Sequence, residues 1–226
     1  MTLKVELHAH TDADPADRIP HSTEQLIAHA ARHGYGAIAV TLHNRWFDPE
    51  PYRALAETHG IVLLRGIERT IHGRHVLLVD MPRDAERVRT FDDVRALKGV
   101  HGGLVVAPHA FYPIPSALRD RLDALVDVVD ALEINSMYVR GIDFNAGARR
   151  WAAAHGTPLV GNTDLHRLEQ LGMTWSEVDA APEPAAICDA IRTGRVVVRT
   201  RPLGWLQAAG LVTRMLASDI GGGARR

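Results

Sequence analysis

Val5-Glu6-Leu7-His8-Ala9-His10-Thr11 is the stretch that decides the fold, because its short apolar run ends in two histidines. The run has strand character, and residues two apart on a strand point to the same face. We therefore expect the imidazoles of His8 and His10 to lie side by side, where both can bind one metal ion. The pair alone is weak evidence, because two histidines at a strand end are often ordinary polar residues.

Residue types that bind metals follow four further strand-like runs. They are Thr41-Leu42-His43-Asn44 after residues 37–40, Gly66-Ile67-Glu68 after 61–64, His109 after 104–107, and Asp164-Leu165-His166 after 159–160. In a barrel of parallel strands, the carboxyl ends of the strands surround one pocket. The recurrence of these residue types therefore predicts one metal site at that end.

Composition limits the class of protein. The 226 residues suit a single α/β domain, and the 46% hydrophobic content is enough for a core. A formal net charge of -1 gives no general electrostatic reason to expect nucleic acid or an anionic membrane as partner. Cys188 is the only cysteine, so no disulfide can form within the chain. The first residues read as neither a secretory signal nor a membrane span, so we expect a cytoplasmic protein.

Strand-like and helix-like segments alternate along the chain. We expect strands at residues 37–41, 61–67, 75–79, 104–107, 128–134 and 159–161, and helices at 22–34, 49–60, 91–97, 116–125 and 144–155. This alternation predicts a mainly parallel sheet with helices outside it, and a closed or nearly closed barrel gathers five strand ends around one pocket. A doubly wound open sheet is the alternative, but its site would lie at one topological switch point.

The C-terminal part departs from this pattern. A helix at 187–192 and a closing strand at 194–198 come before an apolar stripe at helical spacing. The stripe consists of Trp205, Leu206, Leu211, Val212, Met215 and Leu216. We expect a helix docked on the barrel wall or at a dimer interface, since the stripe is short and poor in cations for a membrane-surface helix. Residues 221–226 are expected to be disordered.

The whole motif set resembles that of the PHP (polymerase and histidinol phosphatase) family of metal-dependent phosphoesterases. The resemblance is carried, up to about residue 195, by His8-x-His10, Thr41-x-His43-Asn44, Gly66-x-Glu68, His75, His109 and Asp164-x-His166. It implies an α/β fold, a distorted (β/α)7 TIM-like barrel, that holds two or three divalent metals at its strand ends. We expect this PHP domain to cover residues 1–200, followed by a short C-terminal helical extension, a helix and disordered tail, over residues 201–226.

The resemblance also implies a role for each matching position. The implied metal ligands are His8, His10, Asp14, His43, Glu68, His75, His109, Asp164 and His166. Glu68 would bridge two ions, one shared by the first histidine pair with Asp164 and the other completed by His75 and His109. Glu68, Asp164 and His109 are the predicted catalytic residues. The family usually has proline after the histidine of the fifth motif, whereas here Pro108 comes before it.

The third implied metal site has the least complete set of ligands. His43 and His166 would hold this ion with an aspartate from the loop after the first strand, and Asp14 is our first choice with Asp17 second. The family commonly has aspartate immediately before His43, and this chain has Leu42 there. Loss of that partner is expected to weaken the third site.

The donor set supports metal chemistry without the resemblance. Imidazole with carboxylate suits Mn²⁺, Zn²⁺ or Fe²⁺, whereas Mg²⁺ and Ca²⁺ favour oxygen ligands. Two such ions about 3.5–4 Å apart activate water and neutralise charge on a phosphoryl oxygen. We therefore predict hydrolysis of a small phosphorylated molecule, of the nucleotide or sugar phosphate class. Arg18, Arg45 and Arg140 follow strand ends and are predicted to bind the phosphate, although each also fits a solvated surface position.

Other chemically active residues have simpler interpretations. Glu133 ends a strand, where it either faces the pocket or pairs with an arginine. Cys188 is expected to be a small buried hydrophobic residue. The remaining histidines are expected at the surface or at helix ends, and they are His21, His29, His33, His59, His72, His101 and His155.

Two other functions stay open. An amidohydrolase-like metal hydrolase also begins with His-x-His on a barrel strand, but that family usually bridges its metals with lysine where this chain has Glu68. A non-catalytic metal-binding or regulatory PHP protein would be favoured by lost ligands, and nearly all are present. We expect no polymerase in the same polypeptide, and a homo-oligomer is compatible with the sequence.

Overall fold

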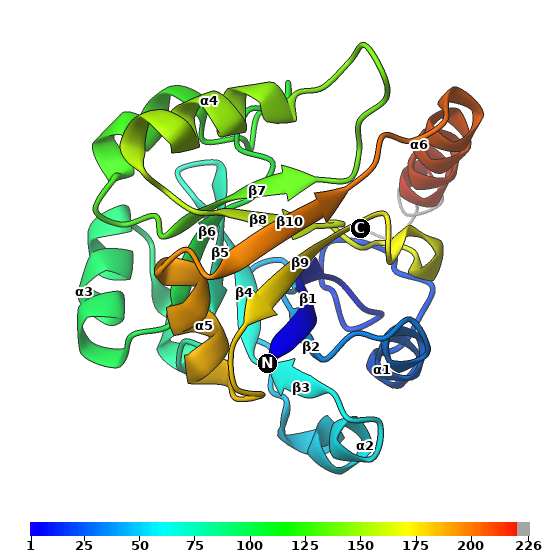
Figure 1. Cartoon of the computed structure of the whole chain (residues 1–226), viewed down its shortest axis with the longest axis horizontal. Coiled ribbons are helices and arrows are strands. Elements are labelled where there is room, and N and C mark those ends of the chain that lie inside the picture. The colour runs from blue at the N-terminus through cyan, green and yellow to red at the C-terminus, as the bar shows by residue number, and fades with distance from the viewer. Residues whose placement is uncertain (221–226) are drawn as a thin grey trace.

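The computed structural model describes residues 1–220, in which strands form two mixed sheets with helices around them (Figure 1). The strands are β1 (Thr2–Ala9), β2 (Ala37–Val40), β3 (Val62–Leu64), β4 (Gly66–Ile71), β5 (Arg74–Val79), β6 (Leu104–Ala107), β7 (Ala131–Asn135), β8 (Leu159–Asn162), β9 (Thr174–Asp179) and β10 (Val196–Thr200). The α-helices are α1 (Thr23–Arg32), α2 (Arg53–Thr58), α3 (Phe91–His101), α4 (Asn145–His155), α5 (Pro184–Arg192) and α6 (Trp205–Ile220). The tail predicted to be disordered, residues 221–226, lies outside the described residues.

Each sheet has five strands, in the orders β10-β9-β1-β2-β3 and β4-β5-β6-β7-β8. The pairs β1–β2, β2–β3, β6–β7 and β7–β8 are parallel. The pairs β1–β9, β9–β10, β4–β5 and β5–β6 are antiparallel. The prediction of a mainly parallel sheet is therefore wrong, because the β4–β5 hairpin and the return strand β9 each add antiparallel pairs.

The sheets meet without a continuous backbone ladder, so a closed (β/α)7 barrel is not confirmed among the described residues. At one seam β8 faces β9, where the Ser176 hydroxyl accepts the Gly161 N–H at 2.8 Å and also lies 3.2 Å from the Gly161 carbonyl oxygen. Single parallel bridges also join Ala9 to Leu165 and His43 to Glu68. These bridges bring together the carboxyl ends of strands from both sheets.

The space between the sheets is filled by apolar side chains, including Val5 and Leu7 of β1 and Val160 of β8. Helix α5 closes one end of this cluster with Ile187 and the buried Cys188, as expected for that cysteine. The interior is therefore solid protein away from the carboxyl ends of the strands.

Two helices show how local sequence fixes the elements around the site. Helix α1 begins after Ser22, whose side chain caps the Gln25 N–H while the Gln25 side chain accepts the Ser22 N–H, as its sequence predicts. The helix predicted at 116–125 is instead a 3₁₀ helix at Arg119–Leu125. Arg119 has a φ of 44°, a left-handed conformation that ends any regular helix from Ser116.

Helix α6 lies at the periphery of the molecule (Figure 1). Its Leu211 packs in a small cluster with Val139, Met173 and Leu203, so this part of the helix contacts the rest of the domain. Trp205 and Leu206 at its start are exposed. Within the described part of the chain, no helix combines the length and hydrophobicity needed to cross a bilayer.

Candidate metal centre

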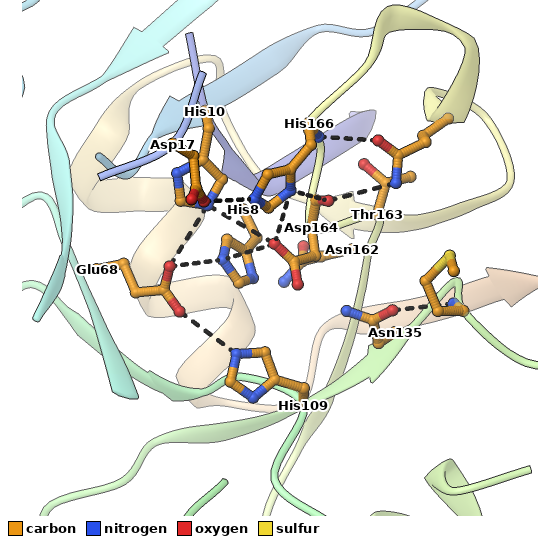
Figure 2. Close-up of polar contacts among 12 residues, drawn as sticks. His8, His10, Asp17, Glu68, His109, Asn135, Asn162, Thr163, Asp164 and His166 are labelled. Atoms are coloured by element: carbon orange, nitrogen blue, oxygen red, sulfur yellow. Dashed lines mark hydrogen bonds and ion pairs between the residues drawn. The ribbon is translucent and has the colours of Figure 1, made fainter. Parts of the chain in front are cut away.

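The predicted metal-binding side chains gather in one cluster where strands of the two sheets meet (Figure 2). His8 lies in β1 and His10 directly follows it, whereas Asp164 and His166 come just after β8 in the chain. Glu68 lies in β4 and His75 in β5, which form one hairpin. His109 follows β6. Both sheets therefore contribute to one polar cluster.

Four side chains meet at the centre of this cluster, and three of them, His8, His10 and Glu68, form a group that could hold a metal ion. His8 Nε2 lies 3.3 Å from Glu68 Oε2 and 3.3 Å from Asp164 Oδ1. His10 Nε2 lies 3.4 Å from the same glutamate oxygen and 3.6 Å from the same aspartate oxygen. Ligands about 2.0–2.1 Å from a tetrahedral ion are about 3.4 Å apart. We call these four residues the inner group.

The two histidine nitrogens of the inner group lack other partners. His8 Nε2 and His10 Nε2 are buried and have no hydrogen-bond partner among the described residues. Buried polar atoms are rarely left this way unless something else binds them. Their other ring nitrogens are held by carboxylates, His8 Nδ1 by Glu133 at 2.8 Å and His10 Nδ1 by Asp14 at 2.8 Å. This arrangement presents the Nε2 lone pairs to the pocket and is common among metal-binding histidines. The inner group therefore fits a divalent ion.

Glu68 extends the cluster with its second oxygen. Oε1 lies 2.6 Å from His75 Nδ1 and 3.4 Å from His109 Nε2, while Oε2 faces the inner group. Burial by itself would raise the pKa of Glu68, but His8, His109 and His75 hold that pKa well below its ordinary value. One ionised carboxylate thus faces two groups of histidines, which is the geometry of a bridging ligand.

The predicted third group is only partly assembled. Asp17 Oδ2 lies 3.0 Å from His166 Nε2 and 3.6 Å from His43 Nδ1. His43 turns its Nε2 toward Glu68 Oε2, at 3.1 Å, and is not directed at His166. Leu42 is buried in an apolar cluster and supplies no polar contact to the group.

Asp14, our first choice for the third group, uses both of its carboxylate oxygens for contacts. Oδ2 contacts the ring nitrogens of His10 and His43 and accepts the His43 N–H at 2.9 Å. Oδ1 accepts the N–H groups of Ala16 and Asp17. Burial would raise the pKa of Asp14, but the His10 and His43 contacts lower it. Asp14 therefore lies against His10 and His43, with which it forms a group that could hold a metal, while Asp17 contacts His166.

Glu133 faces the pocket, which answers the alternative left open by its position in the sequence. Its carboxylate binds His8 Nδ1, accepts the His109 N–H at 3.1 Å and accepts the side-chain amides of Asn135 and Asn162. A buried carboxylate with this many donors is fixed in place. Glu133 thus orients one histidine of the inner group and the backbone of His109.

Glu6 was missed by the sequence reasoning, although it lies two residues before His8. It is fully buried and accepts the N–H and Oγ–H of Thr163, the residue before Asp164. Burial raises the pKa of Glu6 to about 8. A charged residue within an apolar strand run was the signal available in the sequence.

The three arginines predicted to bind substrate are exposed. Arg45 donates to the Ala13 carbonyl oxygen at 2.8 Å, which ties it to the loop that carries Asp14. Arg18 and Arg140 form no hydrogen bond or ion pair with the described residues of the metal-binding cluster.

Most other histidines lie away from the cluster, as expected, but His21 is buried. Its Nε2 donates to the His10 carbonyl oxygen at 3.0 Å. His21 is therefore a structural contact behind the site and not the surface residue that was predicted.

Comparisons with known proteins agree with this picture. Residues 143–196 match a family model described as PHP-associated. The DNA polymerase III PolC-type of Streptococcus mutans is 33% identical over 108 residues, which are 45% of this chain and 7% of that protein. The chain thus spans a small part of the polymerase relatives it matches.

Solved structures share the fold across most of the chain. A two-domain Bacteroides vulgatus protein containing a predicted PHP-like metal-dependent phosphoesterase has a TM-score of 0.71 and 19% identity, covering 96% of this chain and 70% of that one. The lesion-specific endonuclease Q of Pyrococcus furiosus has a TM-score of 0.58 and 17% identity, covering 88% of this chain and 58% of that one. The family-model match and the shared PHP-like fold confirm the resemblance to the PHP family seen in the motifs.

Proposed function

We propose that this protein is a metal-dependent hydrolase of phosphate esters that acts on a small phosphorylated molecule. The observation that carries the proposal is Glu68, whose two carboxylate oxygens face two different sets of histidines. A bridging carboxylate between paired ions is the arrangement that phosphoester hydrolysis uses. The fold shared with PHP-like phosphoesterases supports the same reaction class.

The donor set favours Mn²⁺, Zn²⁺ or Fe²⁺, with two ions and a third where Asp17, His43 and His166 complete a site. Ions held by these residues would supply an activated water and charge neutralisation at the phosphoryl oxygens. The protein itself orients the side chains that would bind these ions. Glu133 and Asp14 keep the imidazole lone pairs directed inward.

Glu68, Asp164 and His109 have the central roles in this proposal. Glu68 holds the two ligand groups at one separation, and Asp164 closes the inner group opposite it. His109 contacts Glu68 through Nε2, and its buried Nδ1 has no hydrogen-bond partner among the described residues. We propose that Arg18, Arg45 and Arg140 bind the substrate phosphate from the loops around the cluster.

A nucleic-acid substrate is the second candidate. It is favoured by the fold shared with endonuclease Q, which has been solved with a 27-mer duplex that carries an abasic lesion at the active site. The net charge of -1 provides no general attraction for such a polyanion. We therefore rank it below a small phosphate ester.

An amidohydrolase reaction has less support. A Chromobacterium violaceum amidohydrolase shares the fold at a TM-score of 0.58. Lysine cannot bridge ions here, because the chain has two lysines and both are engaged elsewhere. Lys4 lies over the Tyr35 and Trp175 rings, and Lys98 binds Asp130. A non-catalytic role would be favoured by lost ligands, and nearly all of the proposed ones are present. The buried, single Cys188 suits the cytoplasm, which we propose as the location.

The proposal is tested by metal analysis followed by phosphate release. Purified protein reconstituted with Mn²⁺, Zn²⁺ or Fe²⁺ under reducing conditions should bind at least two ions per chain. It should then release phosphate from nucleotide or sugar phosphates faster than it cleaves a DNA duplex with an abasic site. Absence of bound metal would remove the basis of the proposal, and faster DNA cleavage would replace the substrate class.

A further inference from the structure

Strand β1 changes the direction of its side chains just before the metal-binding histidines. Val5 and Leu7 point between the two sheets, so strict alternation would turn His8 to the opposite face. Pairing with β2 shifts register between Glu6 and Ala9, and the two residues between them have no partner on β2. Such a bulge re-aims the side chains that follow it. The bulge is therefore what brings His8 into the metal-binding cluster.

Side chains accept the N–H groups of the bulge. The Leu7 N–H donates to Asn162 Oδ1 at 3.1 Å, and the His8 N–H donates to Glu6 Oε1 at 3.0 Å. The same Glu6 carboxylate accepts the Thr163 N–H at 3.0 Å and the Thr163 hydroxyl at 2.7 Å. One buried carboxylate thus joins the bulge of β1 to the end of β8.

Asp164, the residue after Thr163, has a backbone conformation that its surroundings must stabilise. Its φ is 54°, in the left-handed region that non-glycine residues seldom adopt. Both of its neighbours are anchored to β1. Thr163 is held by Glu6, and Leu165 donates to the His8 carbonyl oxygen at 2.9 Å and accepts the His10 N–H at 3.0 Å. These anchors aim the Asp164 carboxylate at the two histidines.

We propose that Glu6 is a positioning residue for the inner group, acting as a hydrogen-bond acceptor that sets the bulge carrying His8 and the backbone carrying Asp164. It touches neither an ion nor a substrate, and the inference rests on the proposed metal site. Without Glu6, the two halves of the inner group lose their common anchor. The second group, His75 and His109 with Glu68 Oε1, has no contact with Glu6 and should be less affected.

Two substitutions separate acceptor chemistry from simple packing. Glu6→Met keeps a long side chain but removes both oxygens, whereas Glu6→Gln keeps one carbonyl oxygen for the same N–H groups. Ser176→Ala is the matched control, because it removes a buried side-chain link to β8 at Gly161 that reaches no proposed ligand. Thr163→Val, nearly equal in shape, removes a single bond to Glu6 and serves if the methionine variant fails to fold.

The measurements are Co²⁺ titration with visible absorption and amide exchange in the metal-free protein. Glu6→Met should bind Co²⁺ at the inner group about 10- to 100-fold more weakly than wild type and should shift the ligand-field bands of the bound ion. Thr163→Val should change the affinity and the bands in the same direction. Glu6→Gln should recover most of the affinity. Ser176→Ala should leave the bands unchanged. Equal affinity and bands in wild type and Glu6→Met, or a glutamine variant as impaired as the methionine one, would overturn the proposal.

Amide exchange keeps this test apart from the proposed function. In metal-free protein, the His8 and Thr163 N–H groups should exchange faster in Glu6→Met than in wild type, and unchanged rates would overturn the role of Glu6. A wild-type protein that binds Co²⁺ but releases no phosphate would refute the hydrolase and leave the Glu6 result standing.

Discussion

Glu68 is the residue at which the two groups of proposed ligands meet, so its substitution tests the proposed bridge directly. Glu68→Gln removes one negative charge and leaves a single oxygen able to bind an ion, so two cations would face each other with less screening. Both ions should weaken together, by more than the roughly 100-fold that an outer hydrogen-bond partner can cost. Metal titration measures this loss, and phosphate release should disappear with it.

His75→Ala is the comparison for that variant, because it removes a ligand from one group only. It should lower the affinity for one ion and leave the inner group occupied. Circular dichroism of the metal-free variants should match wild type, since both side chains lie in the polar cluster and not in the apolar core. A Glu68→Gln protein that keeps two tight ions and its turnover would show that the bridge belongs to another residue.

His166 gives a prediction about pH in the metal-free protein. Burial lowers its pKa, but the hydrogen bond to Asp17 and the charge of Asp164 outweigh this and raise it from the ordinary 6.5 to about 9. Its proton therefore stabilises the metal-free fold fully below pH 6.5, and that stabilisation is lost as pH rises through about 9. The imidazole proton resonances of His166 should titrate near pH 9 by NMR.

Asp17→Asn is the control for this titration. The amide cannot balance the imidazolium charge, so the His166 midpoint should move down toward its ordinary value. A midpoint unaffected by the substitution would remove the Asp17 to His166 pair, and with it the assignment of Asp17 to the third group.

Among the elements, β8 and β9 form the seam between the sheets, and Gly161 makes their approach possible. A Cβ at this position would meet the Trp175 carbonyl oxygen at 2.6 Å, which is backbone and cannot move aside freely. Gly161→Ala should therefore destabilise the fold by about 1–3 kcal/mol, as overpacking generally does. Gly99→Ala in α3 meets nothing within 4 Å and should be neutral or stabilising by up to about 1 kcal/mol. Urea unfolding of both variants decides the comparison.

The elements also show what the sequence could and could not predict. The i and i+2 spacing placed His8 and His10 on one face correctly, because that depends on local strand geometry. The bulge before them was not predictable, since Glu6 forms it with Thr163, 157 positions away. Strand β9 was missed because two of its three inward residues, Thr174 and Ser176, are polar and hide the apolar alternation.

The loop between β1 and α1 was the hardest segment to interpret. Asp14 and Asp17 are both plausible ligands by residue type, and a loop has no periodicity that would show which one faces the site. Their roles separate only in three dimensions, where Asp14 accepts backbone N–H groups and Asp17 contacts His166. The motif histidines were easier to place, because each lies in a strand or a few residues after one.

For the whole molecule, bound metal should act as a link between the two sheets. His8 and His10 belong to one sheet and Glu68 to the other, so an ion shared by them opposes separation of the sheets. Free metal at about 100 times its dissociation constant stabilises the folded state by about 2.7 kcal/mol. For a domain of this size that raises Tm by roughly 5–10 °C.

Thermal unfolding with and without a chelator measures this link. Glu68→Gln gives the matched control, since its Tm should respond little to added metal. A wild-type Tm that ignores both metal and chelator would mean that no ion joins the sheets.

The position of β1 between β2 and β9 also determines when β1 can complete its strand pairing during synthesis. Val5 pairs with Ala37 on one side and with Ser176 on the other, and the second partner is made about 170 residues after the first strand. At about 5–20 residues per second, roughly 10–30 s pass on the ribosome before β1 can gain its second neighbour. One edge of β1 stays unpaired throughout that interval, and Asp164 is absent for nearly all of it. The histidines that are translated first are therefore among the last to acquire their complete surroundings.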